Sequence, residues 1–191
     1  MGKTQSTPEK SALRTELLQV RKGVSPALTP QWDSEICRHI RSFLTQYPVA
    51  QGVGFLPFPG EPDLRKLMAP GETNLIWGVP VVADGLHFYP WTPATPLRKS
   101  PFGFWEPETQ SMPMDFFVPT LILVPAVGLD PQGHRIGFGK GHYDRFLQQI
   151  SAKTCVTMGV VYDACLREAL PQDPWDIPLS HICTQSGWRS T

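Results

Sequence analysis

The residues best suited to chemistry lie in one stretch, Arg135-Ile136-Gly137-Phe138-Gly139-Lys140-Gly141. Three glycines at alternate positions let the backbone approach a ligand closely. Successive amide N–H groups in such a loop form a concave anion site, and a helix that follows directs its positive end there. Arg135 and Lys140 add a full positive charge at each end, so we predict a phosphate-binding loop with these two as candidate catalytic residues. The spacing matches neither the Walker loop nor the dinucleotide fingerprint.

Asp144 follows this loop in the first turn of the predicted helix. One interpretation is structural, since a carboxylate near a helix N-terminus is stabilised by the helix dipole. The other is a magnesium ligand, because Mg²⁺ typically takes one or two carboxylates together with phosphate oxygens. Zinc is not expected, since the four cysteines are widely spaced and form no C-x-x-C pair.

The elements that must position these residues follow from hydrophobic periodicity. Two helices are predicted near the N-terminus, one ended by Gly23 and one with Thr29 as N-cap and Pro30 at its first position. An Ala-Asp-Gly turn between two strand candidates indicates a hairpin. The predicted helices span 9–22, 29–43, 61–68, 141–150 and 164–170. The predicted strands span 49–58, 75–82, 86–91, 119–127, 155–162 and 182–184.

The order of these elements predicts the fold class. Alternating strands and helices, with nearly continuous apolar strands, are typical of an α/β protein with a mainly parallel central sheet covered by helices on both faces. No repeat or linker divides the 191 residues, so we predict a single domain. Twenty-one prolines favour short strands and structured loops in the middle third. Aromatic residues there, among them Phe102 and Trp105, indicate loops that pack rather than disorder, and a flat aromatic ligand is one candidate for what they pack against.

Composition narrows the partners and the compartment. Lysine and arginine total 17, as do aspartate and glutamate, so no basic excess indicates nucleic acid. No apolar run approaches the roughly 20 residues that cross a bilayer, and no secretory signal is apparent. We therefore expect a cytoplasmic protein with reduced thiols, no nucleic-acid or membrane partner, and a monomeric state.

The run VPAVGLDPQGHRIGFGKGHYDRFL, residues 124–147, resembles the signature of the 5-formyltetrahydrofolate cyclo-ligase family, roughly V-P-x-x-x-F-D-x-x-G-x-R-L-G-x-G-x-G-Y-Y-D. Weaker elements follow in the family's order. They are Lys10 to Arg14, Glu61 within Gly-Glu-Pro-Asp-Leu, Trp105-Glu106-Pro107, and Asp176. The resemblance implies one cyclo-ligase-like domain over residues 1–191, with residues 1–9 as a flexible N-terminus.

The resemblance implies roles for individual residues. The ATP-binding set is Lys10, Arg14, Arg135, Ile136, Gly137, Phe138, Gly139, Lys140, Gly141, His142 and Tyr143. The folate-binding set is Leu56, Glu61, Phe102, Trp105 and the overlapping loop residues Phe138, Gly139, Lys140, Gly141 and His142. Asp144 and Asp176 would hold magnesium. Without the resemblance, Lys10 and Arg14 are solvated surface charges and Asp176 is a loop carboxylate.

The sequence departs from the family pattern at three positions. His142 replaces the first tyrosine of the Tyr-Tyr-Asp element, Leu129 replaces a phenylalanine, and Ser180 stands where a second aspartate is common. The first departure puts an aromatic contact in doubt. The third leaves Asp176 without a second C-terminal aspartate to assist it in holding magnesium. None removes a cation assigned to ATP.

The implied reaction is the ATP- and Mg²⁺-dependent cyclisation of 5-formyltetrahydrofolate to 5,10-methenyltetrahydrofolate, with release of ADP and phosphate. Phosphoryl transfer needs positioning and charge neutralisation more than a covalent nucleophile. His134 and His142 are interpreted as solvent-facing structural residues. Two alternatives stay open: a sugar-phosphate isomerase or CoA-transferase-like enzyme of related fold, and a non-catalytic nucleotide-binding module.

Overall fold

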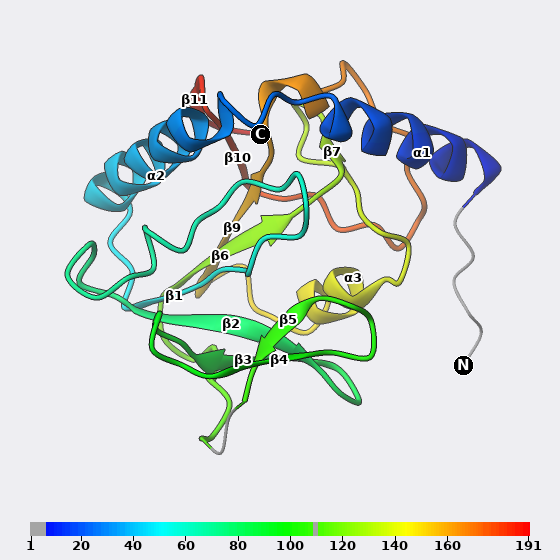
Figure 1. The fold of residues 1–191 in the computed structure, drawn as a ribbon. Helices are drawn as coiled ribbons and strands as arrows, with labels where there is room; N and C mark the ends of the chain where they lie inside the picture. The colour runs from blue at the N-terminus through cyan, green and yellow to red at the C-terminus, as the bar shows by residue number, and fades with distance from the viewer. Residues whose placement is uncertain (1–6, 109–110) are drawn as a thin grey trace.

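The computed structural model describes residues 7–108 and 111–191. Its centre is a seven-stranded sheet with the strand order β11-β10-β9-β6-β1-β2-β3 (Figure 1). The five inner strands are parallel, and β3 and β11 pair antiparallel at the two edges. The sheet strands are β1 (Gln51–Val53), β2 (Ile76–Val82), β3 (Leu86–Pro90), β6 (Thr120–Pro125), β9 (Cys155–Val160), β10 (His181–Thr184) and β11 (Gly187–Ser190).

Helices cover both faces of this sheet, as predicted for an α/β domain. Strand β6 shows why: its apolar side chains alternate between the two faces, a consequence of the two-residue period of a strand. Leu121 and Leu123 pack in the cluster that contains Ile36 and Phe43 of α2 (Thr29–Gln46). Ile122 and Val124 pack in the opposite cluster, which contains residues of α3 (His142–Leu147).

Helix α1 (Pro8–Lys22) packs away from the main sheet, against the segment after β6. Thr7 is its N-cap and accepts a hydrogen bond from the Lys10 amide at 3.3 Å, while Pro8 occupies the first turn. Leu17 is buried beside Val127 and Ile136. The predicted flexible N-terminus is therefore wrong for residues 7–9, and residues 1–6 lie outside the described residues.

Two predicted helices are absent from the described chain at 61–68 and 164–170. In the first segment only residues 65–68 form a turn, where the Met68 amide donates to the Leu64 carbonyl at 3.2 Å, and the Asp63 amide donates to Asp33 Oδ1 of α2 at 3.0 Å. In the second segment only the 3₁₀ turn η1 (Asp163–Cys165) forms. The Arg167 amide donates to the carbonyl of Leu129 at 2.9 Å, so a tertiary contact replaces the helical one.

Other boundaries moved for local reasons. The predicted strand 49–58 is shortened to β1, because the chain turns into a loop rich in proline, which cannot donate to a ladder. Helix α2 begins one residue before its predicted first residue, with Leu28 as N-cap. The unpredicted short strands are β4 (Leu97–Lys99), β5 (Trp105–Pro107), β7 (Gly128–Leu129), β8 (Arg135–Ile136) and β11.

The strand order places a natural crevice between β1 and β6. On one side of this pair the sheet continues from β1 through β2 to β3. On the other side it continues from β6 through β9 and β10 to β11. In open parallel sheets, ligands bind beyond the carboxyl ends of the strands at such a switch point. Among the described residues, no helix is both long and apolar enough to span a membrane.

Candidate active site

A cavity of about 560 Å³ lies at this crevice, and it contains every residue predicted for the site. Phe55 and Leu56 follow β1, Pro125 ends β6, and Pro80 and Val82 belong to β2. Segments from the rest of the chain complete the wall. They are Lys10 and Arg14 of α1, Glu61, Phe102 and Phe104 before β5, Trp105 at the start of β5, the run Arg135 to Asp144, and Asp176.

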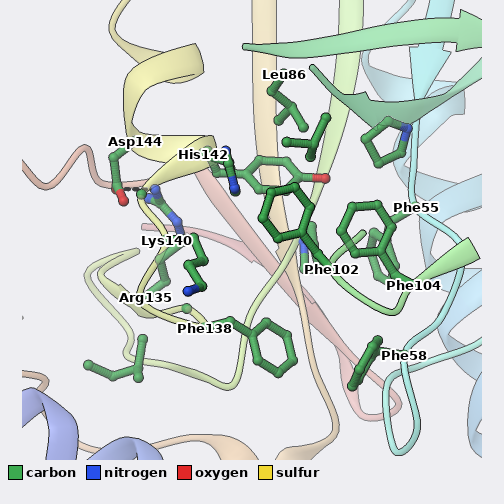
Figure 2. Close-up of a pocket in the computed structure, with 18 of the residues that line it drawn as sticks. Phe55, Phe58, Leu86, Phe102, Phe104, Arg135, Phe138, Lys140, His142 and Asp144 are labelled. Carbon is green, nitrogen blue, oxygen red and sulfur yellow. Dashed lines mark hydrogen bonds and ion pairs between the residues drawn. The ribbon is translucent and has the colours of Figure 1, made fainter. Parts of the chain in front are cut away.

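One half of the cavity is aromatic. Figure 2 shows Phe102, Phe104, Phe55, Phe58 and Phe138 around the same space. The Phe58 and Phe138 rings meet edge to face at 5.5 Å, and the Phe102 and Phe104 rings stack at 6.1 Å. Phe102 is half exposed, so part of its ring is available to a ligand. This half suits a flat heteroaromatic group.

The predicted folate-binding set missed several members of this wall, namely Phe55, Phe58, Pro80, Val82, Leu86 and Phe104. The sequence offers a signal for the first two. They lie in Gly-Phe-Leu-Pro-Phe-Pro, at the carboxyl end of the predicted strand 49–58, and ligands bind beyond the carboxyl ends of parallel strands.

The other half of the cavity is cationic and is formed by the glycine-rich loop. Gly139 and Gly141 have φ of 85° and 65°, a region that disfavours side chains, so glycine is required there. A Cβ on Gly139 would lie 3.3 Å from the guanidinium carbon of Arg14. The Arg14 Nε donates to the carbonyl of Gly137 at 2.6 Å, which ties α1 to the loop.

Helix α3 is shorter than predicted, six residues instead of ten, and Gly141 is its N-cap. Its dipole is correspondingly smaller than that of a longer helix. The positive potential of the loop therefore depends mainly on side chains. Lys140 is exposed and has no ion pair among the residues that the structure describes.

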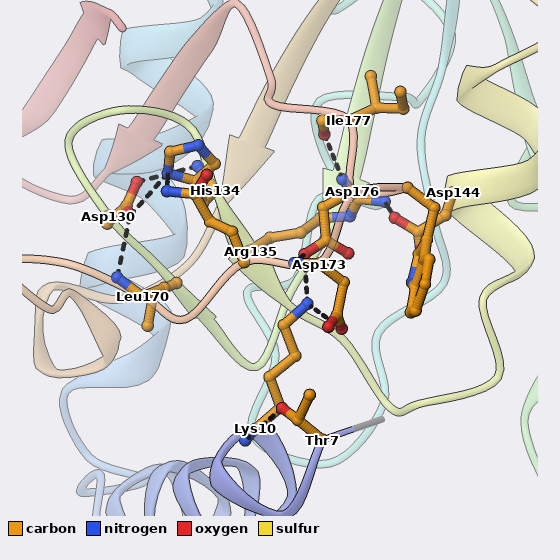
Figure 3. A network of polar contacts seen from close by, with 12 residues as sticks. Thr7, Lys10, Asp130, His134, Arg135, Asp144, Leu170, Asp173, Asp176 and Ile177 are labelled. Atoms are coloured by element: carbon orange, nitrogen blue, oxygen red, sulfur yellow. Dashed lines mark hydrogen bonds and ion pairs between the residues drawn. The ribbon is translucent and has the colours of Figure 1, made fainter. Parts of the chain in front are cut away.

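Arg135 is more deeply placed than a surface phosphate ligand. Its side chain is 5 % exposed, and it donates to the Ile177 carbonyl at 2.7 Å and to Asp144 Oδ1 (Figure 3). Burial lowers the pKa of Arg135, while the carboxylates of Asp144 and Asp176 oppose that effect. Arg135 therefore joins the loop to the C-terminal segment as well as facing the cavity.

Lys10 is also buried, which excludes its interpretation as a solvated surface charge. Its Nζ donates to Asp173 Oδ2 at 2.7 Å and to Asp176 Oδ2 (Figure 3). The Asp173 amide also donates to Asp176 Oδ2, at 2.8 Å. Ser180, which stands where the family often has a second aspartate, takes no part in this network. Its hydroxyl donates to the backbone carbonyl of Thr157 in β9.

The predicted magnesium ligands can be tested against these contacts. Carboxylate oxygens suit Mg²⁺, and Asp144 and Asp176 line one cavity. Both are ion-paired, Asp144 with Arg135 and Asp176 with Lys10. Within the described ranges, no three His, Cys, Asp or Glu residues are grouped to hold a metal. The donor chemistry fits an ion that takes its remaining ligands from phosphate and water.

Glu61 and Tyr143 bring buried polar atoms to the aromatic half. The Phe58 amide donates to Glu61 Oε2 at 2.9 Å, but Glu61 Oε1 and the Tyr143 hydroxyl have no hydrogen-bond partner among the described residues. Burial raises the pKa of Glu61 to about 7, against the lowering effect of Arg21. Burial also raises the pKa of Tyr143. Buried polar atoms of this kind are costly unless a ligand satisfies them.

The two histidines differ in setting. His134 is a structural residue: its Nδ1 lies 3.0 Å from Asp130 Oδ2, and Asp130 also accepts from the Leu170 amide. His142 lines the cavity with its ring 5.7 Å from that of Phe102, so the prediction of a solvent-facing residue is wrong there. Its pKa is lowered by burial and by Arg145 and Lys140.

Fold and site together define an α/β enzyme whose pocket joins an aromatic wall to a cationic glycine-rich loop. The chain belongs to the 5-formyltetrahydrofolate cyclo-ligase family, whose family model matches residues 6–185. It is thus a ligase by family, as predicted, and the reaction is of that family's kind.

Relatives support this assignment over nearly the whole chain. The 5-formyltetrahydrofolate cyclo-ligase of Haemophilus influenzae is 27% identical, covering 93% of this chain and 98% of its own length. That of Escherichia coli K12 is 31% identical, covering 84% and 93%. The NMR structure of Aquifex aeolicus 5,10-methenyltetrahydrofolate synthetase superposes with a TM-score of 0.81 at 29% identity, covering 95% of this chain and 92% of that one.

Proposed function

We propose that this protein cyclises 5-formyltetrahydrofolate to 5,10-methenyltetrahydrofolate with ATP as co-substrate and Mg²⁺ as cofactor, releasing ADP and phosphate. The observation that carries the proposal is the division of one cavity into an aromatic half and a cationic half. A pterin ring suits the first and a triphosphate the second. Their meeting in one space would bring the formyl group next to the terminal phosphate.

The chemistry needs two bond-forming events. The formyl oxygen attacks the γ-phosphorus, the bond to ADP breaks, and the formyl carbon then carries a phosphate leaving group. The N10 amine adds to that carbon and loses its proton, and departure of phosphate gives the methenyl ring. Such phosphoryl transfer depends on alignment and on neutralising charge rather than on a protein nucleophile.

We assign the charge neutralisation first to Lys140, which has no ion pair among the described residues, and then to Arg14 and Arg135. Amide groups of the loop from Arg135 to Gly141 would bind phosphate oxygens. Asp144 and Asp176 would hold Mg²⁺, and the ion would supply additional positive charge at the phosphates. Lys10, which pairs with Asp173 and Asp176, would bind phosphate oxygens and position Asp176.

On the folate side, Leu56, Phe102 and Trp105 would enclose the ring system, with Phe138 at the junction of the two halves. Glu61 would accept hydrogen bonds from N–H donors of the pterin. That role agrees with the buried Glu61 Oε1, which accepts no hydrogen bond from a described residue and lies 3.6 Å from Arg21 Nη1. The partners are then small molecules alone, and we propose a monomer in the cytoplasm.

The test is a set of omission reactions followed by the absorbance of the methenyl product. Product should form only when the folate, ATP and Mg²⁺ are all present, with ADP formed in equal amount. Binding of ATP without product would favour the non-catalytic module. Product without ATP would contradict the proposal.

A further inference from the structure

Arg21, which lies outside the predicted site, is the least exposed arginine of α1. It is 4 % exposed, and it follows Lys10, Arg14 and Leu17 at the spacing of one helical face. Unlike Lys10 and Arg14, it does not line the cavity. A buried cation must be compensated by its surroundings, so its contacts indicate its role.

The side chain of Arg21 contacts two residues that line the cavity, Glu61 and Phe138, and the backbone of the loop before Glu61. Its Nη2 donates to the Pro59 carbonyl at 3.0 Å. Its Nη1 lies 3.6 Å from Glu61 Oε1, in an ion pair whose two side chains are 4 % and 5 % exposed. Its guanidinium carbon lies 5.5 Å from the centroid of the Phe138 ring, a cation–π distance. One side chain thus joins α1, the Glu61 loop and the glycine-rich loop.

Arg21 favours the ionised form of Glu61 by lowering its pKa, although burial raises that pKa by more. The one hydrogen bond to the Glu61 carboxylate among the described residues comes from the Phe58 amide of its own loop. The Tyr143 hydroxyl on α3 is buried and has no hydrogen-bond partner there, and burial raises the pKa of Tyr143. Among the described residues, Arg21 is therefore the one cation paired with Glu61. A carboxylate can accept two pterin N–H bonds, whereas its protonated form loses one acceptor site.

We infer that Arg21 is a positioning residue, which orients Glu61 for the folate and fixes Phe138 at the junction with the nucleotide. This inference rests on the proposed folate role of Glu61. Arg21 itself touches no substrate, so its effect must pass through Glu61 and Phe138.

The inference predicts a specific kinetic signature for Arg21→Met, which keeps the apolar length of the side chain. The KM for 5-formyltetrahydrofolate should rise by about tenfold or more, as expected for loss of a charge-assisted contact, while the KM for ATP changes little. Because Arg21 lowers the pKa of Glu61, its removal raises that pKa. Folate affinity should therefore recover as pH is raised above neutrality, and Arg21→Lys should restore the neutral-pH value in part.

A double-mutant cycle with Glu61→Gln separates positioning from a general packing defect. If Arg21 acts through Glu61, Arg21→Met should add little to the folate KM in the Glu61→Gln background. Arg41→Met is the control, since Arg41 on α2 forms an ion pair with Glu72 at 3.0 Å, and neither residue lines the cavity. It should leave both KM values unchanged.

Three results would overturn the inference. The first is an equal effect of Arg21→Met on the folate KM in the wild-type and the Glu61→Gln backgrounds. The second is a folate KM of Arg21→Met that does not change with pH. The third is a loss of thermal stability with unchanged folate affinity in the folded fraction, measured by direct folate binding. If Glu61→Gln itself leaves folate binding unchanged, the proposed role of Glu61 is what fails.

Discussion

Lys140 carries the clearest expectation for a single side chain, because it is exposed at the cavity and unpaired within the described ranges. Lys140→Ala should raise the KM for ATP by roughly ten- to a hundredfold, the usual effect of removing a charge-assisted phosphate contact of about 1.5–3 kcal/mol. Stability should not change, since no described ion pair is lost. Lys153→Ala, an exposed lysine away from the cavity, is the control. An unaltered KM in Lys140→Ala would refute the phosphate role.

Asp144 and Asp176 make a second residue-level prediction. If both bind one Mg²⁺, Asp144→Asn and Asp176→Asn should each raise the magnesium concentration needed for half-maximal rate. The double mutant should lose less than the product of the single losses, because the two residues serve one ion. Rate is measured against magnesium concentration in all four proteins. Wild-type magnesium dependence in Asp144→Asn would leave that carboxylate only its ion pair with Arg135.

Much of the cavity was predictable at this scale, because loop glycines and cations keep a fixed spacing in the sequence. The sequence did not predict which charged side chains form ion pairs with one another. Lys10 and Asp176 are 166 residues apart, and Arg21 meets Glu61 across 40 positions of chain, so only the fold shows that they compensate each other. Sequence spacing on α1, where Arg21 shares a face with Leu17, is the one signal that Arg21 is buried.

At the scale of elements, the turn between β7 and β8 positions the glycine-rich loop. Gly133 has φ of 84°, and a Cβ there would lie 2.2 Å from the Leu179 carbonyl oxygen. Gly133→Ala should cost about 1–2 kcal/mol for the dihedral alone and more for the backbone shift. Gly71→Ala is the matched control, since φ is 86° but no atom lies within 4 Å. Urea unfolding should show a larger loss for Gly133→Ala, and equal losses would contradict the close contact.

Elements with their own local signals were predictable, and those made by tertiary contacts were not. Strand β3, at 86–90, was predicted from the Ala-Asp-Gly turn that precedes it. Helix α1 was predicted from its hydrophobic periodicity and from Gly23, which ends it. The segment 61–68 has helical periodicity, but only 65–68 forms a turn, and the amide of Asp63 bonds to the distant Asp33. Strands of two or three residues, such as β7 and β8, exist only as pairs, so neither has enough sequence to be recognised alone.

For the whole molecule, the buried Glu61 should appear in the pH dependence of stability. Its folded-state pKa is about 7, against an ordinary value of 4.5, so the folded protein binds the proton more tightly. The free energy of unfolding should therefore fall as pH rises through that window, by about 3 kcal/mol from this group. Glu61→Gln should lose that part of the slope. Identical slopes in wild type and Glu61→Gln would show that the carboxyl titrates normally.

The central claim is that one cavity holds folate and ATP together, so that the formyl oxygen attacks the terminal phosphate. The most direct measurement uses 5-formyltetrahydrofolate with a heavy-oxygen label in its formyl group, followed by mass analysis of the released phosphate. Our account predicts one labelled oxygen in each phosphate, formed in step with methenyl product and ADP. Methenyl product accompanied by unlabelled phosphate would contradict it.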